Sequence, residues 1–481
     1  MAVRTFALLL VLFSLATAQD RTADLPSPER WLQHFERELL PFWDQPSALG
    51  VPLGNFPTTR CDDGTLIDRR APCREVAQNS WLMLDRQYVV ALSRQIYGYG
   101  VAYHLTGQTR FLDYARAGIE HLRRNAIDRR NGGVHAWYEN DRRAWMPASH
   151  EHRNPQELAY ALLGMGFYYY LTRDSDVLPD ILAVKKYIFE RYDNKSLNAL
   201  QWLQRDDGNT KALEKRITAT LDQMNAYMAL LAPTLPEPHR SEWIADLVRL
   251  SRMLMEEFYS PADNLFFLNT TTPDGRDLTK ATVDYGHSIK SLWMIRWTGR
   301  LAGNQELIRF AEEAGPRLLR RAFLEESGSW ATGVTPSGVD KNKSWWVYAE
   351  LDQFAATMAL SDRGLTRFLA RSYDYWLSYF VDPKYGEVWS NVGASNNQNL
   401  GDMPKAWPWK NAYHSMEHAL VAYLTTSELW DRPVTLYYAF KEPPEDSSIR
   451  PYFFNGWITG WQDLSAERGT FYHKVEFRGL W

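Results

Sequence analysis

The sequence predicts an all-α protein, an (α/α)6 barrel in which six helical hairpins close a ring, with a short β-rich appendage at the C-terminus. Three observations predict this fold class. Apolar residues recur at three- and four-residue spacing from about residue 86 to residue 425. Short Gly- and Trp-rich stretches separate the helical segments, and residues 429–481 instead alternate apolar and polar positions. An open solenoid of helical hairpins is the alternative that the same pattern allows.

Residues 1–18 are expected to form a secretory signal peptide. Arg4 precedes an apolar run from Phe6 to Leu15, and Ala16-Thr17-Ala18 offers a small-x-small cleavage site before Gln19. The apolar run is too short to span a bilayer, and no later stretch of the sequence is apolar enough to do so. We therefore expect a periplasmic or secreted protein with no membrane anchor.

Residues 19–85 are predicted to contain an N-terminal helix and a disulfide loop. A helix near Pro28–Phe42 would supply the twelfth helix of the barrel. The only two cysteines, Cys61 and Cys73, lie in a polar loop. In an oxidising compartment such a pair is expected to form a disulfide. A metal site would need further ligands, and the loop offers no nearby histidine.

Residues 86–428 are predicted to form the barrel. The first hairpin pairs RQYVVALSRQIYGYGVAYHL with RFLDYARAGIEHLRR across a short LTGQT turn. The second pairs PQELAYALLGMGFYYYL with DVLPDILAVKKYIFERY, and Pro155 suits a first helical turn. Further pairs begin near Lys215, Tyr285, Trp345 and Asn411. First helices therefore recur roughly every 60–70 residues, which is too long for a 34-residue helical repeat.

Residues 429–481 read as a small strand-rich tail packed on the barrel. VTLYYAF, RPYFFNGW and GTFYHKVEFRGLW alternate apolar and polar residues, with Pro and Gly between them. The whole chain has a formal charge of -4 and no basic run, so nucleic acid is not an expected partner. Its 20 Trp residues are typical of carbohydrate handling, because sugar C–H faces stack on aromatic rings, although many such rings must be core.

Two histidines stand out by their sequence context. The chain has no HExxH, Walker, Rossmann or GxSxG motif. His150 and His152 have only a weak metal-clasp spacing, and a solvated loop is the favoured interpretation, so no metal is expected. His287 and His414 instead each begin an apolar-periodic helix after a loop, among Trp and Tyr residues. Their matching positions on two hairpins indicate a shared site at one mouth of the barrel.

The chain resembles the N-acylglucosamine 2-epimerase superfamily, which includes cellobiose 2-epimerases and mannose isomerases. The resemblance covers roughly residues 80–427. It is carried by RQIYGYGVAYHLTG, GHSIKSLWM, SWWVYAELDQFAA and WKNAYH, of which the WWxxAE and WKxxYH strings are the most specific. The resemblance implies an (α/α)6 barrel, in agreement with the helical-hairpin pattern.

The resemblance also implies roles for single residues. His287 and His414 match the family's acid/base histidines, and Arg94, Trp345, Trp346, Glu350 and Trp409 match substrate-contacting positions. The sequence departs from the family twice. Tyr227 stands near Asn225 where a histidine is frequent, and is taken as a substrate-binding candidate. Lys290 stands three residues after His287, where a glutamate is common.

The function expected from these residues is a sugar 2-epimerase or an aldose–ketose isomerase that needs no cofactor. Imidazole titrates near neutrality and can move a proton next to a carbonyl, while Arg94 could stabilise the enolate oxygen. His414 is predicted to be the stronger base, with Glu417 one helical turn later as a catalytic partner. Lys290, one turn after His287, is predicted to depress the pKa of that imidazole.

Two other functions stay open at this point. One is a glycoside hydrolase or lyase on the same barrel, which would use carboxylates such as Glu350, Glu417 or Asp284. The other is a non-catalytic carbohydrate-binding protein. Tyr227 and Lys290 favour these alternatives because they alter the family's acid/base residues. In all three cases the expected partner is a mono- or oligosaccharide.

Overall fold

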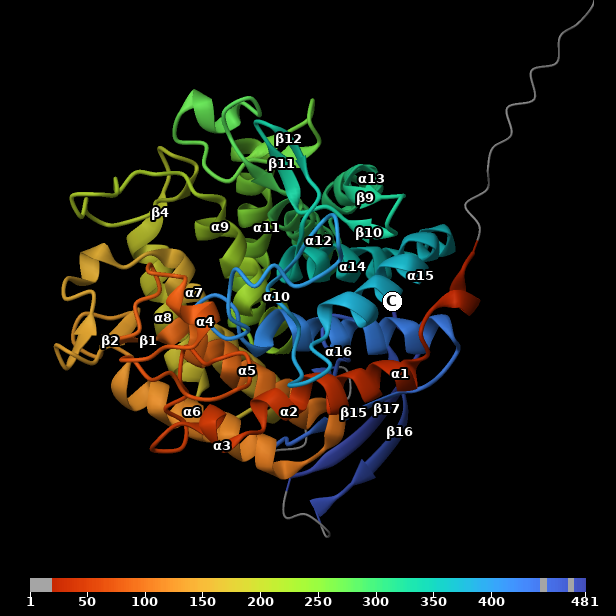
Figure 1. The fold of residues 1–481 in the computed structure, drawn as a ribbon, viewed down its shortest axis with the longest axis horizontal. Helices are drawn as coiled ribbons and strands as arrows, with labels where there is room; N and C mark the ends of the chain where they lie inside the picture. Colours follow the sequence, from red (N-terminus) through yellow and green to blue (C-terminus); the bar gives the residue numbers. More distant parts are fainter. Residues whose placement is uncertain (1–19, 442–447, 466–470) are drawn as a thin grey trace, which may run out of the picture.

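The computed structural model describes residues 20–441, 448–465 and 471–481, and helices dominate these segments (Figure 1). The predicted signal peptide, residues 1–18, lies outside the described residues. Among the residues that are described, no helix is both long enough and apolar enough to cross a membrane.

A ring of buried helices forms the centre of the molecule. A helix that is apolar around its whole circumference must be covered on every side, and in α5 all but the last residue are buried. Within the described residues each ring helix contacts the next, and α16 contacts α5 to close the ring. The ring helices are α5 (Val89–Thr106), α7 (Pro155–Thr172), α9 (Ile217–Gln223) continuing through a π-helical stretch (Met224–Met228) into α10 (Ala229–Leu231), α12 (Tyr285–Ala302), α14 (Trp345–Ala359) and α16 (Ala412–Leu429).

Amphipathic helices cover the outside of this ring. In α6 the buried residues Phe111, Leu112, Ala115, Ile119 and Leu122 follow helical spacing, so one face packs inward and the other meets solvent. The outer helices are α6 (Thr109–Asn125), α8 (Leu178–Tyr192), α11 (His239–Glu257), α13 (Gln305–Ala322) and α15 (Thr366–Tyr375) with its π-helical end (Trp376–Phe380). The helix expected near Pro28–Phe42 is also present, as α1 (Pro28–Gln33), a π-helical stretch (His34–Leu39) and α2 (Leu40–Trp43), and α1 packs on α16.

Short antiparallel strands lie at the rim where the ring helices begin. The strand residue Tyr88 directly precedes α5, Asp284 precedes α12 and Ser344 precedes α14. These strands are β1 (Arg86–Tyr88), β2 (Trp137–Glu139), β3 (Ala144–Met146), β4 (Asp193–Asn194), β5 (Ala199–Leu200), β6 (Tyr259–Ser260), β7 (Leu265–Phe266), β8 (Val283–Asp284), β9 (Phe323–Leu324), β10 (Ser329–Trp330), β11 (Gly333–Thr335), β12 (Gly338–Asp340), β13 (Lys343–Ser344) and β14 (Asn391–Val392). The strands thereby fix where several ring helices start.

Single turns of helix complete the connections between these elements. Two are α-helical, α3 (Pro46–Leu49) and α4 (Arg74–Ala77). The remainder are 3-10 turns at Thr22–Asp24, His150–His152, Ala232–Thr234, Pro273–Arg276 and Arg363–Leu365.

A C-terminal sheet packs on the opposite end of the ring. Its strands β15 (Val434–Tyr438), β16 (Trp457–Asp463) and β17 (His473–Arg478) are antiparallel in the order β15–β17–β16 (Figure 1). β15 contacts α5 near its end, where the Tyr103 hydroxyl donates to the Tyr438 carbonyl at 2.6 Å. Tyr452 and Phe453, which precede β16, are buried against aromatic rings of α5 and α12.

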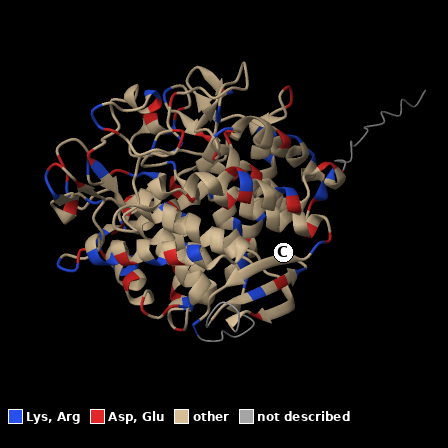
Figure 2. Cartoon of the chain, turned by 60° about the horizontal axis from the view of Figure 1, so that its bottom comes forward, with Lys and Arg blue, Asp and Glu red and all other residues tan. Residues whose placement is uncertain are grey.

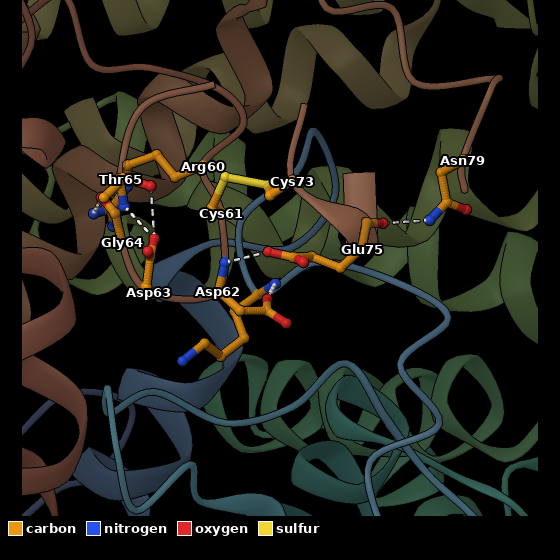
Figure 3. Close-up of a disulfide and its surroundings, with 10 residues drawn as sticks. Arg60, Cys61, Asp62, Asp63, Gly64, Thr65, Cys73, Glu75 and Asn79 are labelled. Atoms are coloured by element: carbon orange, nitrogen blue, oxygen red, sulfur yellow. Dashed lines mark hydrogen bonds between the residues drawn. A yellow bond between two sulfur atoms is a disulfide. The ribbon is translucent and has the colours of Figure 1, made fainter. Parts of the chain in front are cut away.

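Cys61 and Cys73 are bonded to each other, which confirms the predicted disulfide (Figure 3). Basic and acidic side chains are interspersed over the outer helices and loops in the view of Figure 2. The absence of a nucleic-acid partner stays a prediction.

Candidate active site

A cavity of about 390 Å³ lies at the rim where the ring helices begin, and its size suits a small ligand. It is lined by Arg94, Gln156, Tyr160, Thr218, His287, Lys290, Ser344, Trp345, Trp346, Asn391, Met403, Trp407, Trp409 and His414. Most of these residues sit in the first turns of ring helices or in the segments just before them. The ring therefore brings residues from positions 94 to 414 to one place.

His287 is held by the residue that caps its own helix. Asp284 is the N-cap of α12, and its Oδ1 accepts a hydrogen bond from the His287 backbone N–H at 2.6 Å. Its Oδ2 lies 2.8 Å from His287 Nδ1, which leaves Nε2 free for a ligand. Although burial disfavours the charged imidazole, the Asp284 carboxylate holds the pKa of His287 above its usual value. Lys290 does lower this pKa, as the sequence predicted, but the Asp284 carboxylate outweighs it and the pKa of His287 ends above its usual value.

His414 lies in the opposite electrostatic situation. Burial, reinforced by the nearby Lys290 and Arg94 cations, holds the pKa of His414 well below its usual value. Its Nδ1 is 3.5 Å from Glu350 Oε1. The pKa of His414 is thus lowered, whereas the sequence predicted that Glu417 would stabilise its charged form. The catalytic roles of His414 and Glu417 stay predictions.

Lys290 and Glu350 form a buried ion pair beside the two histidines. The Lys290 ammonium lies 3.0 Å from Glu350 Oε1. Despite burial, the Glu350 carboxylate raises the pKa of Lys290 above its ordinary value, so the lysine stays charged. Glu350 itself is fully buried and does not line the cavity. Glu350 was predicted to bind substrate. It instead contacts the cavity residues Lys290 and His414 without lining the cavity itself.

Glu417 is fully buried inside the ring and does not line the cavity. Burial and the neighbouring Glu350 carboxylate raise the pKa of Glu417 to about 8, so it is protonated at neutral pH. The Tyr452 hydroxyl donates to Glu417 Oε1. Ligand atoms of Glu350, His414 and Glu417 lie within 4.8 Å of one another. A metal ion there would be repelled by the Lys290 ammonium, which lies 3.0 Å from Glu350 Oε1.

Arg94 and the aromatic residues shape the rest of the cavity. The Arg94 guanidinium is 3% exposed and stacks over the Tyr160 ring at 4.2 Å. It donates to the Trp409 carbonyl, and its Nε has no hydrogen-bond partner within the described part of the chain. The Trp346 ring contacts both histidines, with its centroid 4.7 Å from that of His287 and 6.0 Å from that of His414.

Tyr227 is not part of this cavity, and its prediction as a substrate-binding residue is corrected. The side chain is fully buried, its ring packs edge-on against Trp243 of α11 at 5.5 Å, and its hydroxyl donates to Gln223. Asn225, two residues earlier, points inward and donates to the Tyr413 hydroxyl at 2.9 Å. Residues two apart on a helix face opposite sides, so Asn225 turns inward and Tyr227 outward.

Several cavity residues escaped the sequence prediction. Tyr160 and Gln156 line the cavity and both donate to Asp222, at 3.2 Å and 2.9 Å. Nothing in their local sequence separates them from core residues. The contact of Asp284 with His287, which lies behind the cavity, could have been expected from the sequence, since an aspartate three residues before His287 at a helix start is a typical N-cap. Trp407 could also have been expected in the cavity, because it lies two residues before the WKNAYH string.

Comparison with known proteins identifies the chain's relatives. A family model described as N-acylglucosamine 2-epimerase matches residues 77–418. A cellobiose 2-epimerase from Ruminococcus albus is 22% identical over 343 residues, which cover 68% of this chain and 85% of that protein. A cellobiose 2-epimerase from Dictyoglomus turgidum is 24% identical over 343 residues, with 68% and 84% covered.

Solved structures share the fold. A sugar epimerase from a ruminal bacterium has a TM-score of 0.67 at 19% identity and covers 83% of this chain and 98% of that one. A D-mannose isomerase has a TM-score of 0.67 at 16% identity, with 82% and 97% covered. Because the family model spans more than half of the sequence, the chain belongs to the N-acylglucosamine 2-epimerase family.

Proposed function

We propose that the protein is a sugar 2-epimerase or aldose–ketose isomerase that moves the proton next to the carbonyl between His287 and His414. One observation carries this proposal. The two imidazoles line one cavity, both contact the Trp346 ring, and their surroundings shift their pKa values in opposite directions. An acid and a base are therefore available together near neutral pH, which proton transfer at carbon requires.

The reaction starts at His414, which is neutral because of its lowered pKa. Its Nε2 accepts the C2 proton, the C–H electron pair moves into the C1–C2 bond, and the carbonyl oxygen gains the negative charge. Charged His287 then donates a proton from Nε2. Delivery to the opposite face of C2 gives the epimer. Delivery to C1, with the O2 proton moved to O1, gives the ketose. Neither course needs a cofactor.

Arg94 stabilises the intermediate in this scheme. Its guanidinium lines the cavity and has no carboxylate partner within the described residues. An oxyanion on the substrate would meet a fixed positive charge in a site of low dielectric constant. Trp345, Trp346 and Trp409 offer ring faces for the sugar.

The same proposal includes an (α/α)6 barrel fold and an exported location for the protein. The cyclic order of helix contacts supports an (α/α)6 barrel with the three-stranded sheet as its appendage. The N-terminal sequence and the disulfide support export to the periplasm or beyond the cell.

The carboxylate alternative has less support from the geometry. A glycoside hydrolase needs two carboxyl groups facing the scissile bond. No aspartate or glutamate lines the cavity within the described residues, since Asp284, Glu350 and Glu417 all contact other side chains behind its surface.

Proton NMR of cellobiose, glucose and mannose in deuterium oxide with the purified protein tests the proposal. We expect solvent deuterium at C2 for an epimerase and at C1 for an isomerase. New reducing ends would instead identify a hydrolase. Sugar binding without any exchange at C1 or C2 would identify a non-catalytic binding protein.

A further inference from the structure

A path of tryptophans leads from the outside of the molecule to the histidine pair. Trp81 is 51% exposed, and its ring centroid lies 5.5 Å from that of Trp407. Trp407 lines the cavity and lies 6.1 Å from Trp345, which in turn lies 6.4 Å from His414. The aromatic lining therefore continues past the mouth of the cavity onto Trp81, which no role in proton transfer explains.

The loop that carries Trp81 is fixed against the segment that leads into the cavity residue Met403. Trp81 Nε1 donates to Asn79 Oδ1 at 3.2 Å, and Asn79 Nδ2 donates to the Asp402 carbonyl at 2.7 Å. The Gln78 side chain also donates to the Gly401 carbonyl. Asp402 directly precedes Met403, a cavity residue. Trp81 is thus held in place although half of its surface faces solvent.

The disulfide ties this loop to the residues just before Trp407. Figure 3 shows the Cys61–Cys73 bridge between Asp62 and the start of α4. The Asp62 backbone N–H donates to the Glu75 carboxylate at 2.8 Å, and the Asp62 side chain accepts from the Lys405 backbone at 2.8 Å. The cross-linked loop therefore contacts the chain two residues before Trp407.

We propose that Trp81 and Trp407 form an outer subsite that binds a further ring of an oligosaccharide whose reducing end lies at the histidine pair. This inference rests on the proposed function and names its substrate class as a reducing oligosaccharide. A monosaccharide held at the histidines would contact Trp345, Trp346 and Trp409 and leave Trp81 unused. An exposed indole held rigidly binds a sugar face at low cost in conformational entropy.

The experiment compares the wild type with Trp81→Ala on sugars of increasing length. The matched control is Trp457→Ala, which removes an even more exposed tryptophan, 71% exposed, from β16 of the C-terminal sheet. Glucose, cellobiose and cellotetraose, with the corresponding β-1,4-mannose series, are titrated by calorimetry, and KM and kcat come from deuterium exchange. For Trp81→Ala we expect affinity for the tetrasaccharide to fall about tenfold, with KM rising equally. Binding of the monosaccharide and kcat should stay unchanged.

Two results would overturn the outer subsite. One is wild-type protein that binds neither tetrasaccharide more tightly than its monosaccharide. The other is Trp81→Ala protein that binds the tetrasaccharide like the Trp457→Ala control. Calorimetry does not depend on turnover, so wild type that binds longer sugars more tightly but exchanges no deuterium contradicts the proposed function and leaves the subsite supported.

Discussion

The Asp284 carboxylate makes two contacts: it caps the N-terminus of α12 and hydrogen-bonds to the Nδ1 of His287. In Asp284→Asn the cap is retained, because asparagine is an equally good N-cap, while the charge that raises the pKa of His287 is lost. If charged His287 is the acid, activity falls as pH rises through its pKa. We expect the alkaline limb of the kcat profile to move to lower pH, with the partly exposed Asp277→Asn, outside the cavity, as an unshifted control. An unmoved limb would contradict His287 as the acid.

The two histidines and Glu417 should respond differently to substitution. His287→Asn and His414→Asn should each lower kcat about a hundredfold or more, the range expected for losing general acid–base catalysis. Glu417→Gln should change kcat only severalfold, because Glu417, with a pKa of about 8, is already protonated at neutral pH. Deuterium exchange kinetics measure all three variants. A Glu417→Gln variant as inactive as His414→Asn would restore Glu417 to a catalytic role.

The Lys290–Glu350 pair should matter for stability as a pair. Glu350→Gln leaves a buried ammonium without its partner, which typically costs about 3–5 kcal/mol. Adding Lys290→Met removes that ammonium, so the double variant should regain most of the loss. Urea unfolding of both single variants and the double variant gives the coupling free energy. Additive losses would show that the two side chains do not act as a pair.

At the scale of whole elements, the sequence predicted where each helix lies along the chain better than it predicted which way the side chains on that helix point. Ring helices such as α5 were recognisable because apolar residues recur at three- and four-residue spacing along them. Spacing could not say which way a polar side chain turns. His414 and Glu417 are one turn apart on α16, yet the imidazole approaches Glu350 of the neighbouring α14. That contact depends on how two ring helices pack, which a single sequence does not specify.

The disulfide should stabilise one element as well as the fold. The bridge spans a sequence separation of 12 and should contribute roughly 2–3 kcal/mol by restricting the unfolded chain. We expect the Cys61→Ser, Cys73→Ser double variant to lose about that much in urea unfolding, and native-state hydrogen exchange to rise in the loop that carries Trp81. Exchange that rises equally across all ring helices would show that the bridge does not hold this loop locally.

For the molecule as a whole, the C-terminal segment closes the end of the ring opposite the cavity. Phe453 is 2% exposed, and its ring lies 5.3 Å from Trp293 and 5.8 Å from Trp297 of α12. Phe453→Ala should therefore lower the free energy of unfolding by about 3–5 kcal/mol. Phe471→Ala, at a residue 45% exposed, should cost much less. Equal effects in thermal unfolding would mean that the segment does not support the ring.

Ring closure also sets a time order for biosynthesis. The ribosome synthesises the chain from its N-terminus, so Arg94 emerges long before Trp409, whose carbonyl it contacts. Helix α5 therefore cannot pack against α16 until the second helix has been made. Tyr452, which donates to Glu417, emerges later still. Half-made chains consequently hold apolar ring helices without neighbours and are exposed to aggregation. A chain that is cut short before residue 414 has no histidine pair, so the proposed proton transfer requires translation beyond His414.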